Sequence, residues 1–431
     1  MAALSDHPLR YPMTNELHAR PFPAVASSKC VAYLAIKSES NSGARDREAD
    51  KHHLVALLDR YGASHPQPGA THYYSELGNY QLRWESHTEF FTYTLIGDLN
   101  VAESWDSRLF EVYPQDWLAE APGSLIASAL VRIEPANVQE SQWQRMSEWF
   151  VPESLAVSEI LEGQIVAASD FRIDHSGHSR FVAFVQPNVD ERRTGRVVQQ
   201  LCEIETYKTM AMLGFNHAKT LSPTMREMDS RFMQLTSKVS GALTMPDETL
   251  HELLRVSAEL EDTVAKSSFR FGATTAYESI VYQRINGLRE AQIHGQQTLG
   301  DFMSRRFDPA MRTVKSTQDR LLKMAERAQR AADMLRTRVD VQRSSQSQAL
   351  LKSMNKRAET QLRLQRTVEG LSIVAISYYA VNLVMFLLAP LADRLAVSGT
   401  MLKAIATPVV VVCVWVFVHR LRARLMHNDS D

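Results

Sequence analysis

Hydrophobic and polar residues are distributed very differently along this chain, and the sharpest contrast lies near its C-terminal end. Leu371–Leu391 and Ala404–Val418 are two apolar stretches without a charged side chain. As a helix, the first stretch would measure roughly 30 Å, which matches the hydrocarbon core of a bilayer. The second is shorter, but Lys403 can extend its ammonium group toward the membrane surface. The pattern therefore predicts two transmembrane helices.

The region before the first apolar stretch has the pattern of one long helix. No proline lies between Pro309 and Pro390, and Gly370 is the only glycine between them. We therefore predict a continuous helix from Pro309 to about Leu391, whose polar part would be roughly 90 Å long. Apolar residues recur in it at alternating steps of four and three, and the stripe then becomes polar: Leu321, Ala325, Ala328, Ala332, Leu335 and Val339, followed by Gln342 and Gln346. This heptad stripe needs a partner, either the preceding helix folded back or further copies of the chain.

The first 190 residues have the pattern of a mixed α/β domain. Strands are predicted at Cys30–Ile36, on both sides of the Gly78-Asn79 turn, at Glu89–Gly97, at Ser124–Glu134 and on both sides of the turn His175–His178. Helices are predicted at Arg45–Tyr61 and Trp143–Trp149. Cys30–Ile36 has no polar face, which indicates a central strand.

Strand signals stop after Asp190, and the following residues have helical spacing. Pro223 and Pro246 are predicted to begin new helices, because proline is well tolerated in a first helical turn. The helix from Asp247 is predicted to run toward His294. The fold class is therefore an α+β cytoplasmic head, a long helical stalk and two C-terminal transmembrane helices. The predicted segments are the head 1–190, a helical region 191–308, a basic stalk helix 309–370, transmembrane helix 371–391, an external loop 392–403, transmembrane helix 404–418 and a basic tail 419–431.

Charge and cysteine content indicate the compartment. The chain has 48 basic and 49 acidic residues, but Arg312–Arg366 holds 14 basic and 5 acidic ones. The first residues contain no apolar run, so no secretory signal is predicted. The three cysteines are far apart and odd in number, which favours a reducing compartment over a disulfide framework. Basic residues flank the outer ends of the two spans, so both termini are predicted to be cytoplasmic.

Two stretches carry a resemblance to a family. They are HPLRYPMTNELHARPFPAV, from His7 to Val25, and TVEGLSIVAISYYAVNL, from Thr367 to Leu383. Together they resemble a bacterial family of uncharacterised membrane-anchored proteins, a domain-of-unknown-function family. The resemblance implies a multi-pass protein of the bacterial inner membrane and no particular activity.

The order of parts also resembles, more weakly, the CorA-type magnesium channels. Those channels combine an α/β cytoplasmic domain, a very long helix and two C-terminal spans, and they assemble as pentamers. Their Gly-Met-Asn signature at the end of the first span is absent here, where the chain reads LLAPLADRL. Magnesium selectivity therefore does not carry over. A divalent cation stays among the conceivable partners, because Glu369 precedes the first span and would either bind it in an oligomeric ring or pair with Arg363 or Arg366.

Polar residues within the first span are the main candidates for a site. Ser377, Tyr378, Tyr379 and Asn382 lie in otherwise apolar surroundings. Such groups face a protein interior or a cavity, so they would either line a pore or form hydrogen bonds between helices.

A second candidate lies near the N-terminus. Glu16, His18 and Arg20 alternate in a segment that the following prolines keep extended, so their side chains would share a face. They would form either a ligand or catalytic site, or a clip that anchors the N-terminal arm to the head.

The basic residues just before the membrane are predicted to contact anionic lipid headgroups: Lys352, Lys356, Arg357, Arg363 and Arg366. Nucleic acid is not expected, because the stalk lacks aromatic residues on which bases could stack. His175 and His178 are weak metal candidates, because Asp174 is the only carboxylate or cysteine near them in the sequence.

Several common catalytic motifs are missing, among them GxxxxGK[ST], GxGxxG, HExxH, CxxC and GxSxG. The sequence thus predicts no catalytic residue, cofactor or resident metal. Three functional classes stay open: a membrane-anchored scaffold or regulatory protein that self-associates through its long helix, a CorA-like oligomeric ion channel, and a membrane-tethered enzyme.

Overall fold

A computed structural model describes most of the chain. The described residues are 4–11, 13–14, 23–38, 45–100, 105, 107–136, 139–240, 246–395 and 399–428. They form two compact units, Met1–Asp333 and Met334–Asp431. The predicted mixed α+β architecture is present, with one large sheet and several long helices.

The first unit is built on a sheet of nine strands among the described residues, in the order β2-β3-β4-β1-β5-β8-β7-β6-β9. Neighbouring strands are antiparallel except β5 and β8, which are parallel. The strands are β1 (Lys29–Lys37), β2 (His72–Leu77), β3 (Tyr80–Ser86), β4 (Phe90–Asp98), β5 (Ser124–Pro135), β6 (Ala156–Ile160), β7 (Ile165–Ile173), β8 (Ser179–Val185) and β9 (Ala291–Gln292). The predicted strands are confirmed, and β1 is central, between β4 and β5. The strands β6 and β9 were not predicted.

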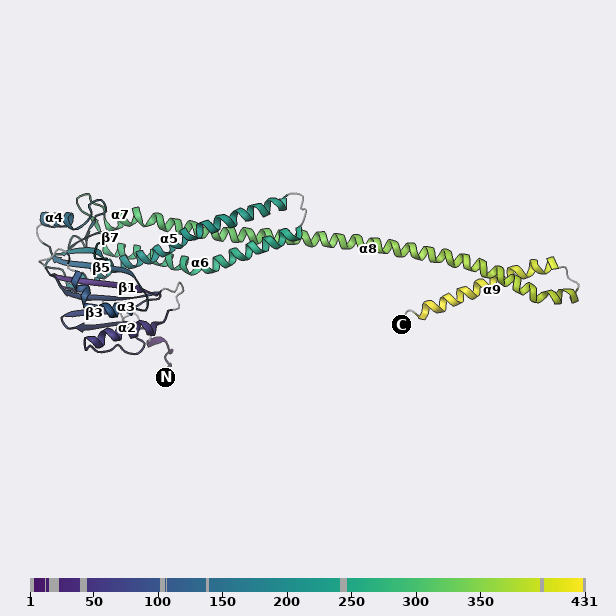
Figure 1. Ribbon diagram of the computed structural model, residues 1–431, viewed down its shortest axis with the longest axis horizontal. Helices are drawn as coiled ribbons and strands as arrows, with labels where there is room; N and C mark the ends of the chain where they lie inside the picture. The colour runs from purple at the N-terminus through teal and green to yellow at the C-terminus, as the bar shows by residue number, and fades with distance from the viewer. Residues whose placement is uncertain are drawn as a thin grey trace. The chain divides into compact units, whose positions relative to one another are not determined.

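One face of the sheet is covered by short helices, which Figure 1 shows beside the strands. They are α2 (Arg47–Arg60), the 3₁₀ helix η1 (Ser107–Val112), α3 (Gln115–Ala119) and α4 (Gln139–Trp149). The apolar side of α2 places Leu54, Leu57 and Leu58 against aromatic residues of β3 and β4 in a buried core. Burial of this apolar surface is the main force that holds α2 on the sheet.

The opposite face is covered by long helices. They are α5 (Glu191–Ser240), α6 (Pro246–Leu288) and the shorter α7 (Leu299–Arg306). The helices α5 and α6 approach closely at Gly214, where an added Cβ would lie 2.0 Å from Thr274 Oγ1. The prediction that Pro223 begins a helix is wrong, since Pro223 lies inside α5. Packing of α5 against α6, with Met225 and Phe232 buried, outweighs the local cost of proline.

Helix α8 (Asp308–Leu395) is the predicted long helix, and it is unbroken from end to end. In the first unit, α8 contacts the long helices α5 and α6. Lys315 pairs with Glu278 of α6 at 2.8 Å, and Arg320 pairs with Asp229 of α5 at 3.0 Å. All six residues of the predicted heptad stripe are buried, with exposed fractions of 4% or less. The N-terminal end of the heptad stripe therefore packs against α5 and α6 of the same chain.

The second unit contains the rest of α8 and helix α9 (Gly399–Asn428). Both helices extend into the stretch predicted as an external loop, so only residues 396–398 separate them. Figure 1 shows that α9 runs back from the end of α8. The covered face of α8 has helical spacing and consists of Ile373, Ser377, Ala380, Val381, Val384, Met385 and Leu388. Four half-covered residues of α9 recur at steps of four, Ala406, Val410, Val414 and Val418, and Val416 is half-covered as well. The two helices thus form a hairpin through these faces.

The buried His53 of α2 makes the stability of the first unit depend on pH. Its Nε2–H donates to the carbonyl of Trp117 at 3.0 Å, and its Nδ1 accepts from the Tyr93 hydroxyl at 2.9 Å. Burial lowers the pKa of His53 to about 4, and the bond to Trp117 opposes this only in part. The unfolded chain, with a pKa near 6.5, therefore binds a proton that the folded chain excludes.

We predict that the free energy of unfolding falls by roughly 3 kcal/mol as the pH is lowered from about 6.5 to about 4 because of this group. His53→Gln should remove that part of the pH dependence, at some cost in stability at neutral pH. Denaturant unfolding followed by tryptophan fluorescence at several pH values measures it. His52→Gln, at the exposed neighbouring position, is the matched control and should keep the wild-type slope. Equal slopes in all three proteins would contradict the prediction.

Candidate functional sites

The polar residues of the first apolar span lie on two different faces of α8. Ser377 is 5% exposed, whereas Tyr378 and Tyr379 are 66% and 71% exposed. Asn382 is also exposed, and its Nδ2 donates to the Tyr378 carbonyl at 3.1 Å within the same helix. The structure therefore separates Ser377, on the face toward α9, from Tyr378 and Asn382 on the open face.

Among the other residues singled out by the sequence, those that the structure describes do not converge on one site. Glu16, His18 and Arg20 fall outside the described residues. The five basic residues before the span are all exposed on α8: Lys352, Lys356, Arg357, Arg363 and Arg366. His175 is exposed, whereas His178 bonds the Ser128 hydroxyl at 2.5 Å and stacks on Phe110. Within the described ranges no group of three or more His, Cys, Asp and Glu side chains is placed to hold a metal.

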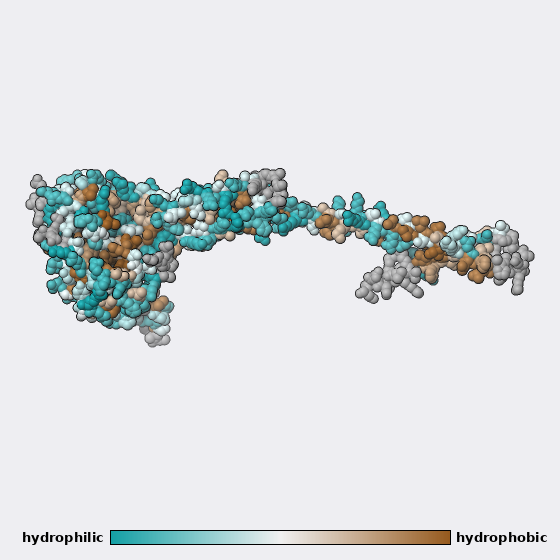
Figure 2. All heavy atoms as spheres, in the orientation of Figure 1, coloured by the Kyte–Doolittle hydropathy of each residue, from teal (hydrophilic) through white to brown (hydrophobic). Residues whose placement is uncertain are grey.

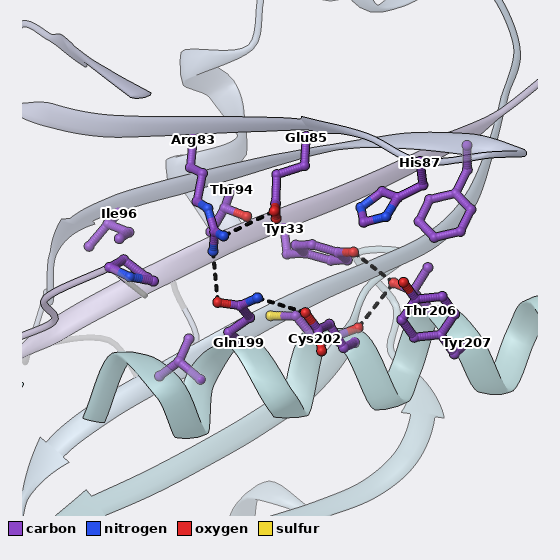
Figure 3. Close-up of a pocket in the computed structure, with 14 residues that line it drawn as sticks. Tyr33, Arg83, Glu85, His87, Thr94, Ile96, Gln199, Cys202, Thr206 and Tyr207 are labelled. Carbon is purple, nitrogen blue, oxygen red and sulfur yellow. Dashed lines mark hydrogen bonds and ion pairs between the residues drawn. The ribbon is translucent and has the colours of Figure 1, made fainter. Parts of the chain in front are cut away.

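A largely buried polar network, which sequence reasoning missed, connects the sheet to α5, as Figure 3 shows, and α5 in turn to α6. Arg83 of β3 donates to Glu85 at 3.0 Å and to Gln199 of α5 at 2.9 Å. Gln199 in turn donates to Glu203 at 2.7 Å, and Glu203 also pairs with Arg284 of α6. Each charge therefore has an opposite partner, as burial requires. No motif encodes this network, because its members are distant in sequence.

The cavity beside this network contains two reactive residue types in unreactive forms. Burial, followed by the charges of Glu203 and Glu205, raises the pKa of the Cys202 thiol, so the thiol stays protonated. Burial also raises the pKa of Tyr33 well above its usual value, and its hydroxyl accepts a hydrogen bond from Thr206 at 2.8 Å. The enclosed space is about 20 Å³, which holds one water molecule and no substrate. The arrangement therefore favours a structural role.

A second buried junction joins the start of β4 to α6. Glu89 is 4% exposed, and it accepts hydrogen bonds from Arg270 at 2.6 Å and from the Tyr277 hydroxyl at 2.7 Å. Burial and the neighbouring Glu89 raise the pKa of Tyr277, so it donates as a neutral phenol. Burial lowers the pKa of the nearby Lys37, with Arg270 as a further cause. The Glu89 carboxylate is thus the shared acceptor at this junction.

We predict that Glu89→Gln lowers the free energy of unfolding of the first unit by about 3 kcal/mol, because it leaves the buried Arg270 without its counter-ion. Asp262→Asn is the matched control in the same helix, since Asp262 pairs with Lys266 at the surface. An exposed pair of this kind contributes less than about 1 kcal/mol. Hydrogen exchange of α6 amides and denaturant unfolding measure both effects. Similar losses of unfolding free energy in the two variants would show that the Glu89 junction contributes no more to stability than a surface ion pair.

A ligand-sized cleft lies on the other face of the sheet. Its volume is about 530 Å³, in the range of small-molecule sites. Its lining includes Cys30 of β1, Leu130 and Arg132 of β5, Tyr61 and Tyr80, and residues of η1. Arg132 is buried, pairs with Glu134 and lies over the Trp149 ring at 5.2 Å. Several elements contribute to the cleft, so no local sequence pattern predicts it.

The largest apolar surface belongs to the second unit. Figure 2 shows hydrophobic residues gathered over the end of α8 and over α9. Exposed fractions there reach 84% at Phe386, 71% at Tyr379 and 67% at Phe417. Two helices in this region are long and apolar enough to cross a membrane, and only 6% and 0% of their apolar windows is buried.

These observations define a mixed α+β protein with a helical C-terminal unit of exposed apolar surface. The chain belongs to the family described as Protein of unknown function (DUF3422), which matches residues 5–425. The resemblance to a domain-of-unknown-function family is thereby confirmed. Comparison with curated proteins and with solved structures gave no match.

Proposed function

We propose that this protein is a membrane-anchored scaffold or regulatory protein that self-associates through α8. The observation that carries the proposal is the exposed apolar surface of α8 and α9. The core helix of a soluble protein would be mostly buried, whereas the two apolar windows here are 6% and 0% buried. Exposed apolar patches of this extent mark a membrane or protein interface, and their length fits a bilayer.

The charges around the two spans support a cytoplasmic location for the head. Arg363 and Arg366 precede the first span and are exposed, as is Arg420 after the second. Such residues favour the cytoplasmic side and attract anionic headgroups of an inner bacterial membrane. On this proposal the spans form a hairpin, and both termini lie in the cytoplasm.

The head supports a binding or regulatory role better than catalysis. Its buried network pairs each charge, and its buried thiol and phenol stay protonated. A regulatory ligand would fit the 530 Å³ cleft. A CorA-like channel is the alternative, and it requires a ring of first spans with a continuous axial path lined by Asn382. Cation flux in liposomes separates this alternative from the scaffold.

We predict that the wild-type protein stays in the membrane pellet after alkaline carbonate extraction. Leu383→Lys combined with Val412→Lys should release it or prevent its insertion, because each lysine near mid-span costs about 2.5–3.5 kcal/mol. Leu351→Lys with Leu362→Lys is the matched control, since both residues are exposed on the polar part of α8. The control should behave as wild type. Release of the wild-type protein by carbonate would refute anchoring.

The orientation gives a separate prediction. A fluorescent reporter fused after Asp431 should be active, and alkaline phosphatase fused there should be inactive, because the basic residues after the second span stay inside. The same reporters fused after Lys403, in a chain that ends there, should give the reverse result. Active phosphatase after Asp431 would overturn the proposed orientation.

A further inference from the structure

A continuous open stripe on α8 identifies the surface that would meet a second copy. Every described side chain from residue 340 to 368 is exposed in the single chain, and so is one face of the following apolar stretch. Along this part of α8, one set of positions repeats at alternating steps of four and three residues. The set is Leu350, Met354, Arg357, Gln361, Leu364, Val368, Leu371, Ala375, Tyr378 and Asn382. We call these ten residues the open seam.

The open seam occupies the positions that a coiled coil turns toward its partner helix. A period of 3.5 residues keeps one stripe facing a partner helix over many turns, which contact with lipid alone does not require. The seam begins eleven residues after Val339, the last buried residue of the heptad stripe. Eleven residues make about three helical turns, so both stripes follow the same side of the helix. The open seam therefore continues a stripe that is already used for helix packing.

Most charged side chains in this part of α8 lie away from the open seam, as contact between two identical helices requires. Six of the seven charged residues between 352 and 369 lie outside the seam and its flanking positions: Lys352, Lys356, Glu359, Arg363, Arg366 and Glu369. The flanking positions carry uncharged residues such as Ala358, Thr360, Gln365 and Thr367. Two identical seams can thus approach without like charges beside them, although the helix is basic. Arg357 is the exception, and its long side chain can turn outward to water.

The second unit leaves the same face free. Ser377 and Ile373, on the face toward α9, lie on the side of α8 opposite to Ala375, Tyr378 and Asn382. Asn382 uses one Nδ2 hydrogen for the Tyr378 carbonyl, and no other hydrogen bond of its side chain is seen among the described residues. Its position in the seam is one at which asparagine fixes register by pairing with its own copy. In an apolar environment such a bond stabilises helix association.

We propose that the open seam packs in parallel and in register against the open seam of a second copy of this chain, with the two Asn382 side chains paired. The proposal rests on the proposed function in one respect, because two copies anchored in one membrane by the same hairpin are necessarily parallel. The partner is a second copy rather than another protein, since the charged residues other than Arg357 lie away from the seam, and an identical seam can therefore approach it.

Cysteine cross-linking of the full chain tests the seam. In a Cys413→Ser background, which removes the exposed thiol, Leu364→Cys and Val368→Cys place a thiol on the seam. Arg366→Cys places one on the opposite side of the same turn. Under mild oxidation in native membranes, both seam variants should form the covalent dimer at least about tenfold faster than Arg366→Cys, because disulfides need Cα atoms within about 7 Å. Equal rates at the three positions, or the fastest rate at 366, would overturn the seam.

Mass measurement in detergent gives a second, independent result. Asn382→Leu should weaken the dimer about 3- to 30-fold, as expected for loss of one interhelical hydrogen bond. Ser377→Ala is the matched control on the face toward α9 and should leave the dimer unchanged. A stronger effect of Ser377→Ala than of Asn382→Leu would contradict the proposal.

The two proposals can fail separately. If carbonate leaves the protein in the membrane but the three cysteine positions cross-link at equal rates, the seam is refuted and anchoring is not. If the seam positions cross-link fastest but carbonate releases the protein, anchoring is refuted and the seam is not.

Discussion

The organisation of this protein depends on helix α8, whose side chains meet different surroundings along its length. Backbone hydrogen bonding in α8 is the same from Asp308 to Leu395, so only the surroundings of its side chains differ along its length. At its start, the stripe from Leu321 to Ala332 is buried beside α5 and α6. Further on, its side chains are exposed, first polar and then apolar. A helix with so little buried surface is not stable by itself, and this need for partners underlies the proposed anchoring and self-association.

The head depends on a different constraint, the pairing of charges between the sheet and the long helices. Glu89 with Arg270, and Glu203 with Arg284, connect elements that lie far apart in the sequence. The Glu89–Arg270 pair is buried, whereas the Arg284 side chain is 32% exposed. A buried pair adds little net stability, but breaking it is costly. The two pairs therefore fix how α5 and α6 lie on the sheet. Because α8 packs against these two helices, its first turns are positioned by the same contacts.

The chemistry of the head agrees with a binding or regulatory role. Cys202 and Tyr33, the reactive residue types beside the buried network, are held in their neutral forms by burial. The space beside them holds one water molecule, whereas the cleft on the other face has the size of a ligand site. Binding there and self-association in α8 would involve separate parts of the chain.

The sequence by itself determined the local elements and the surfaces that need a partner. Most of the strands, the long helix α8 and the two apolar stretches follow from periodicity and from the spacing of proline and glycine, which act over short distances. Tertiary structure alone decided that Pro223 stays within α5, that β8 lies parallel to β5, and that Ser377 rather than Asn382 lies on the face toward α9. The Glu89 junction and the ligand-sized cleft also arise only in the folded chain. The physical reason is that pairing of buried charges and packing of helices depend on residues brought together from distant positions, which no local pattern records.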